Sequence, residues 1–120
     1  MAFSKAEQYA SEHDVLHLAA NYCKALSYPG RILIVRWLAR EGPKSALEIS
    51  RFISLSPATT SYHLARLERA GMITGYEHGP NITYVFNDEF FPVIRSFVEL
   101  VFDQIEDSAR KRRGSDGMNA

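Results

Sequence analysis

The chain has 120 residues, 46% of them hydrophobic, and a formal net charge of zero at pH 7, so any surface for nucleic acid must be local. This length suits one domain with one core. Since no apolar run can span a bilayer or serve as a signal region, we expect a cytoplasmic protein without membrane contacts. The single cysteine, Cys23, excludes an internal disulfide and a thiolate cluster for a metal.

Two helices are predicted early in the chain, after residues 1–10, which carry no periodic pattern and are expected to be flexible. Apolar residues then recur at helical spacing, which predicts a helix over residues 11–27 with Cys23 on its apolar side. Cys23 is therefore expected to be a buried small hydrophobe; the alternative is a redox-sensing or ligand-contacting thiol. A Tyr-Pro-Gly sequence interrupts the chain before a second helix over residues 31–40.

Capping signals mark the starts of two further helices. A serine and a glutamate at S-x-x-E spacing form a capping box, which predicts a helix over residues 46–53. Ser56 is a suitable N-cap and Pro57 a suitable first residue for the next helix, residues 57–70, which Gly71 ends. Two helices joined by such a short turn form a helix-turn-helix.

The helix over residues 57–70 has two different faces. One side is apolar, while the other is small and polar at its start and basic towards its end. Such a face suits a helix whose first turns read base edges in a major groove while later arginines contact phosphates; an ordinary surface helix is the alternative. The candidate DNA-binding residues on and around this helix are Lys44, Arg51, Ser56, Thr59, Ser61, Tyr62, His63 and Arg66, with His78 in the following segment.

Beyond Gly71 the apolar period changes to about two, which predicts two strands on either side of a turn at residues 78–81. A hairpin directly after a helix-turn-helix is the wing of a winged-helix domain. The expected fold is therefore mainly α, a winged helix-turn-helix with five helices and a small β-hairpin, in one domain over residues 11–110.

The last helix, expected over residues 89–110, has more apolar surface than one small domain buries in its own core. This surplus predicts a partner helix and a dimer; a central core helix in a monomer is the alternative. Residues 111–120 are expected to be a disordered basic and polar tail. Its basic run is either a solvated helix end or an auxiliary phosphate-binding arm.

Several short pieces of the sequence together resemble the ArsR/SmtB family of bacterial repressors over roughly residues 12–106. They are Ser27 to Val35, Ala46 to Ile49, Leu55-Ser56, Ser61 to Leu64 with Leu67, Ala70 to Ile73, and Tyr84. The resemblance implies a homodimer, paired mainly through the first and last helices, that binds an inverted-repeat operator and is released by an inducer. The candidate dimerisation residues are Leu16, Ala19, Cys23, Phe97, Val98, Val101, Phe102 and Ile105.

The metal ligands that are typical of this family are missing here. Its arsenic and cadmium sensors carry a cysteine pair at the start of the third helix, where residues 44–46 are Lys-Ser-Ala. Its zinc and nickel sensors use histidines and carboxylates on the last helix, which has no histidine in this chain. His13 and His17 have chelating i, i+4 spacing, but no third ligand is evident. We therefore predict no metal and no cofactor.

These features predict a sequence-specific DNA-binding transcriptional regulator, most simply a dimeric repressor released by a non-metal signal. A small apolar molecule, a protein partner, a redox signal at Cys23 and regulation by abundance all stay open as that signal. The alternative function is a winged-helix protein-interaction module without specific DNA binding. An enzyme is not expected, because no nucleophile has an evident base and there is no phosphate loop.

Overall fold

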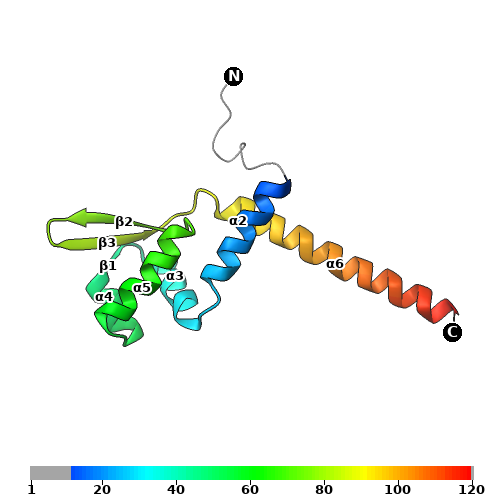
Figure 1. Cartoon of the computed structure of the whole chain (residues 1–120), viewed down its shortest axis with the longest axis horizontal. Helices are drawn as coiled ribbons and strands as arrows, with labels where there is room; N and C mark the ends of the chain where they lie inside the picture. Colours follow the sequence, from blue (N-terminus) through cyan, green and yellow to red (C-terminus); the bar gives the residue numbers. More distant parts are fainter. Residues whose placement is uncertain (1–11, 120) are drawn as a thin grey trace, which may run out of the picture.

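The computed structural model describes residues 12–119, and the predicted flexible segment 1–10 lies outside them (Figure 1). Five helices and three strands form in these residues, which confirms the predicted mainly α winged helix-turn-helix. In chain order they are α2 (Glu12–Ala25), α3 (Pro29–Glu41), β1 (Lys44–Ser45), α4 (Ala46–Ile53), α5 (Pro57–Arg69), β2 (Ile73–His78), β3 (Asn81–Phe86) and α6 (Phe91–Asn119).

The predicted caps form where the sequence placed them. The Ser45 hydroxyl accepts a hydrogen bond from the backbone N–H of Glu48 (3.1 Å), and the Glu48 carboxylate accepts one from the Ser45 N–H (3.0 Å). The Ser56 hydroxyl accepts from the N–H of Thr59 (3.2 Å), which fixes the start of α5. Gly71 takes the positive φ of 82° that ends this helix.

The sheet has three antiparallel strands in the order β1-β3-β2. β2 and β3 form the predicted wing, with His78 paired to Asn81 across a tight turn in which Gly79 has a φ of 59°. The sequence did not predict β1, a two-residue strand that pairs Lys44 with Tyr84. This pairing joins the start of the helix-turn-helix to the wing, so the two parts hold a fixed relative position.

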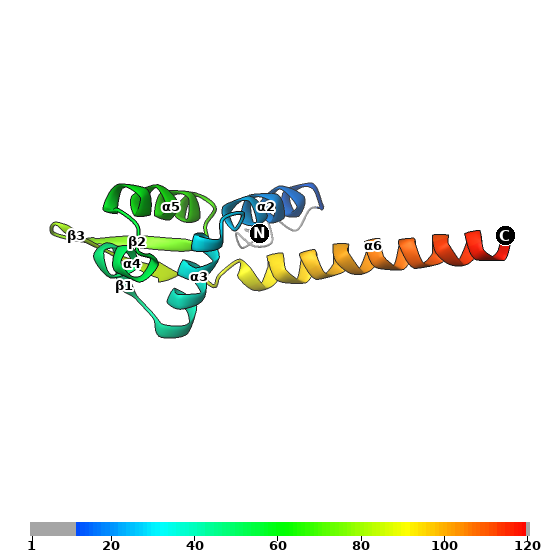
Figure 2. The same ribbon diagram turned by 90° about the horizontal axis from the view of Figure 1, so that it is seen from below.

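The core lies where α3, α4, α5 and the base of the wing meet. Its most buried side chains come from each of these elements and are at most 1% exposed: Ile34, Leu38, Ile49, Leu64, Leu67, Met72 and Ile73. The predicted inner face of α5 therefore packs inward, which leaves the opposite face of this helix to the outside. α2 and α5 lie on the same side of the molecule (Figure 2).

Cys23 is exposed, so its predicted burial is wrong. The buried side chains of α2 recur at Val15, Ala19 and Tyr22. Cys23 follows Tyr22 by one residue, which turns it by about 100° around the helix and out of the buried stripe.

The last helix is longer than predicted and projects away from the rest of the domain (Figures 1 and 2). It runs to Asn119, whereas the sequence pattern predicted an end near Arg110 and a disordered tail over residues 111–120. Lys111 forms an ion pair with Asp107 one turn earlier (3.0 Å), and the basic residues of this stretch favour helix, so the helix continues. No helix in the described part of the chain combines the length and the apolar character needed to cross a membrane.

Candidate nucleic-acid interface

The outer face of α5 is polar, exposed and adjacent to the wing. Thr59 and Ser61 are exposed in its first turns, and Tyr62 follows with 53% of its surface exposed. A groove of about 570 Å³ separates the start of this helix from the wing, and both Ser61 and His78 line it. The structure thus brings two sequence-predicted residues, one from the helix and one from the hairpin, to the same groove.

Tyr62 and Arg66 act as a pair on this face. The Arg66 Nη2 donates a hydrogen bond to the Tyr62 hydroxyl oxygen (3.2 Å), and the guanidinium carbon lies 5.2 Å from the ring centroid. This hydrogen bond, together with the positive charge of Arg66, lowers the pKa of Tyr62. Because the phenol accepts from Arg66, its own hydrogen stays available to be donated.

His63 is buried and does not lie on the exposed outer face of α5, so a DNA contact for this residue stays a prediction. Only 9% of it is exposed, and its Nδ1 accepts a hydrogen bond from the Nε of Arg31 (3.0 Å). Such an acceptor is unprotonated, so His63 is neutral with its proton on Nε2. Burial lowers its pKa, and the nearby Arg31 charge lowers it further.

Arg31 was not among the predicted site residues, although it contacts His63, Tyr28 and Tyr62. It is 4% exposed, donates from Nη1 to the carbonyl of Ala25 (3.4 Å), and places its guanidinium 4.8 Å from the Tyr28 ring and 5.7 Å from the Tyr62 ring. The signal was present in the sequence. Arg31 precedes the buried residues Ile34, Val35 and Leu38 at helical spacing, which places it on their face.

Two of the predicted DNA-binding residues, Lys44 and Arg51, do not line the groove between α5 and the wing. Lys44 places its Nζ 5.0 Å from the ring centroid of Trp37, which stacks on Phe52 with the centroids 4.1 Å apart. Arg51 is exposed in the last turn of α4. Neither lines the groove beside the wing, so a DNA contact for either stays a prediction.

The predicted dimerisation residues divide into three groups: buried, exposed and half-buried. Ala19 is buried in the core of its own chain. Leu16 (48% exposed), Phe102 (66%) and Ile105 (61%) present apolar surface to the outside, and Cys23 is also exposed. The others, Phe97, Val98 and Val101, are half-buried.

No metal centre is formed within the described part of the chain, where no three His, Cys, Asp or Glu side chains gather closely enough to hold an ion. The His13 side chain, half of the i, i+4 pair with His17, lies outside the described residues.

We expect the stability of the fold to depend on pH through His63. Because its pKa is lowered in the folded state, the unfolded chain binds a proton more readily, so the free energy of unfolding should fall as pH drops below the ordinary histidine value of about 6.5. The variant His63→Asn keeps an acceptor for Arg31 but does not titrate. Its thermal midpoint should change less with pH than that of the wild type. In the control His78→Asn, at the exposed wing, the thermal midpoint should change with pH as it does in the wild type. If it changes equally with pH in both variants, His63 is not the source of the pH dependence.

Comparisons with known proteins agree with this geometry. A model of the family described as bacterial regulatory protein, arsR family, matches residues 28–74. The chain is 34% identical over 84 residues to the HTH-type transcriptional regulator YgaV of Escherichia coli K12, covering 70% of this chain and 85% of that protein. It is 30% identical over 83 residues to the uncharacterized HTH-type transcriptional regulator MJ1325 of Methanocaldococcus jannaschii, covering 68% of this chain and 93% of that protein.

A solved structure shares the fold. The NMR structure of the homodimeric winged helix-turn-helix DNA-binding domain of Mb0332 from Mycobacterium bovis, a possible ArsR-family regulator, superposes with a TM-score of 0.61. The two chains are 23% identical, and the match covers 87% of this chain and 92% of that one. The likeness confirms the winged helix-turn-helix fold.

Proposed function

Because this chain belongs to the arsR family of bacterial regulatory proteins, and is a transcriptional regulator with a DNA-binding winged helix-turn-helix, we propose that it acts as a dimeric repressor. The dimer binds an inverted-repeat operator, with one α5 helix in each of two successive major grooves. It represses by occupying the operator, which requires no catalysis. A non-metal signal then releases it.

The observation that carries this proposal is the outer face of α5. Thr59, Ser61 and Tyr62 offer hydroxyl groups in the first turns of the helix, where base edges come within hydrogen-bond reach. The only acid on this helix, Glu68, accepts a hydrogen bond from the N–H of Gly75 in β2 (3.2 Å), which directs its carboxylate to the sheet. The reading face is therefore free of a carboxylate that would repel phosphate.

The dimer rests on the apolar surface of α6. α6 packs against α2, and in this contact Tyr22 and Phe91, the first residue of α6, have ring centroids 6.4 Å apart. Farther along, Phe102 and Ile105 remain exposed. A second α6, with the adjacent surface of α2, would cover these side chains, and the M. bovis relative that shares this fold is a homodimer. Leu16 and Cys23 are the exposed residues of α2 that we include in this interface.

Two variants of α5 should separate base reading from phosphate binding. Tyr62→Ala should weaken binding to the specific operator by about 1–3 kcal/mol, with little effect on other sequences. Arg66→Ala should weaken binding to all sequences. It should also reduce the slope of log K against log salt concentration by about one unit. Since the two side chains are hydrogen-bonded, the loss in the double variant should be smaller than the sum of the single losses.

Gel shifts on footprinted operator DNA and on random duplex, each at two salt concentrations, provide the measurement. Arg40→Gln, an exposed cation in the last turn of α3, is the control and should behave as wild type. If neither Tyr62→Ala nor Arg66→Ala changes binding, α5 is not the reading helix, and the protein-interaction module becomes the better account.

A further inference from the structure

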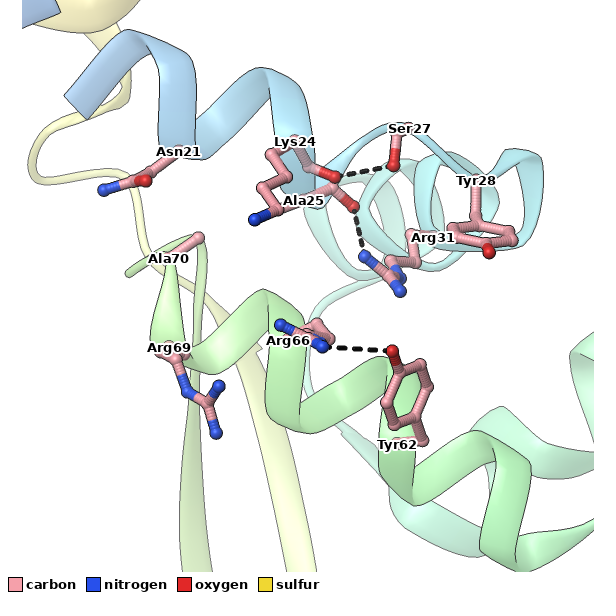
Figure 3. Close-up of a pocket in the computed structure, with 10 residues that line it drawn as sticks. All are labelled: Asn21, Lys24, Ala25, Ser27, Tyr28, Arg31, Tyr62, Arg66, Arg69 and Ala70. Carbon is pink, nitrogen blue, oxygen red and sulfur yellow. Dashed lines mark hydrogen bonds between the residues drawn. The ribbon is translucent and has the colours of Figure 1, made fainter. Parts of the chain in front are cut away.

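A cationic pocket of about 420 Å³ lies where the end of α2 and the start of α3 face α5 (Figure 3). Four basic residues from three helices surround it. Lys24 comes from α2, Arg31 from α3, and Arg66 and Arg69 from α5. No carboxylate is among the residues that line the pocket, so all of its charged lining residues are positive.

The charges around this cationic pocket have no counter-charge among the described residues. Two ion pairs form in the described part of the chain, Arg95 with Glu99 and Lys111 with Asp107. Both lie on α6, and neither involves a residue of the cationic pocket. Arg31 is the critical case, because it is almost fully buried and every group it contacts is neutral: the His63 ring, a backbone carbonyl and two tyrosine rings. A buried guanidinium normally has an anionic partner, and here the open side of the pocket is where that partner can enter.

The remaining polar groups are also suited to an oxyanion. The Tyr62 hydroxyl accepts from Arg66 and can donate its hydrogen into the cationic pocket. Tyr28 and Asn21 line the same space and carry further donors. Arginine guanidinium groups bind phosphate oxygens in bidentate fashion, whereas lysine supplies a point charge. Several donors and four positive charges match a doubly charged tetrahedral anion.

We propose that the cationic pocket binds a phosphate group, with Arg31 as its buried charge partner and Lys24, Arg66 and Arg69 around its opening. The pocket has room for more than a bare phosphate, so a phosphate group carried by a larger molecule also fits. Two sources share this chemistry, the DNA backbone and a free phosphorylated small molecule. Since Arg66 also belongs to the α5 reading face, occupation of the pocket by a free phosphate would compete with DNA.

Titration of the full-length protein with inorganic phosphate, at constant ionic strength adjusted with chloride, tests the pocket directly. The nitrogen-15 NMR resonance of the Arg31 Nε–H should shift saturably with phosphate and not with chloride. The double variant Lys24→Gln/Arg69→Gln changes two exposed side chains, so it should fold normally and raise the dissociation constant about tenfold or more. Arg40→Gln should leave the constant unchanged. A shift without saturation, or equal affinity in the double variant, overturns the proposal.

The salt dependence of binding to duplex DNA, measured on the same variants, identifies the source of the phosphate. If the DNA backbone fills the cationic pocket, the slope of log K against log salt should fall by about one unit in Lys24→Gln/Arg69→Gln. If a free phosphorylated molecule fills it, that slope should stay unchanged, and added phosphate should displace DNA from the wild type at constant ionic strength. The NMR titration contains no DNA, so a failure of the repressor proposal and a failure of this pocket are distinguishable.

Discussion

Replacing Phe102 by glutamate is expected to raise the dissociation constant of the proposed homodimer by about 30-fold to 1,000-fold. Phe102 is 66% exposed on α6, and a large aromatic side chain at the centre of an interface typically contributes about 2–4 kcal/mol. The variant removes this ring and introduces a carboxylate that would need to be buried without a partner. Sedimentation of wild type and variant over a range of concentrations gives the two constants.

Gln104→Glu is the matched control for Phe102→Glu, because it adds the same charge to an exposed position of α6 without removing apolar surface. It should sediment as the wild type does. The dimer proposal is wrong if the wild type is a monomer at tens of micromolar, or if Phe102→Glu dimerises as tightly as the wild type. Loss of the dimer should also weaken operator binding, because the two half-sites would no longer be held by one molecule.

Replacing Leu67 by alanine should lower the free energy of unfolding by about 2–5 kcal/mol. Leu67 is 0% exposed and belongs to the core that holds α5 against α3, α4 and β2. Removing its side chain leaves a cavity beneath α5, so the cost includes both lost apolar burial and lost packing. Urea unfolding at a fixed protein concentration provides the measurement, since the proposed dimerisation would make the apparent stability depend on concentration.

Leu47→Ala tests whether the loss in Leu67→Ala comes from burial rather than from the substitution itself. Leu47 is 54% exposed on the neighbouring helix α4, so the same substitution should change the free energy of unfolding by no more than about 0.5 kcal/mol. Comparable losses at Leu47 and Leu67 would show that the core around Leu67 does not hold α5 in place.

The sequence by itself determined the features that depend on neighbouring residues. The Ser45–Glu48 capping box, the Ser56 cap and the left-handed Gly71 were all predicted correctly, because each involves groups within a few residues of one another. Helical periodicity also identified the inner face of α5, where Leu64 and Leu67 are buried. These local signals were sufficient for the fold and for the exposed hydroxyl groups on the outer face of α5.

Only the tertiary structure decided which polar residues are buried and what they contact. His63 and Arg31 are 32 residues apart in the sequence, and no local pattern reports that the ring of one accepts from the guanidinium of the other. In the fold His63 is buried against Arg31, and Arg31 lines the cationic pocket together with Lys24 and Arg69. The physical reason is that a hydrogen bond between distant segments depends on how the helices pack. Periodicity assigns a residue to a face but does not identify the partner that the face will meet.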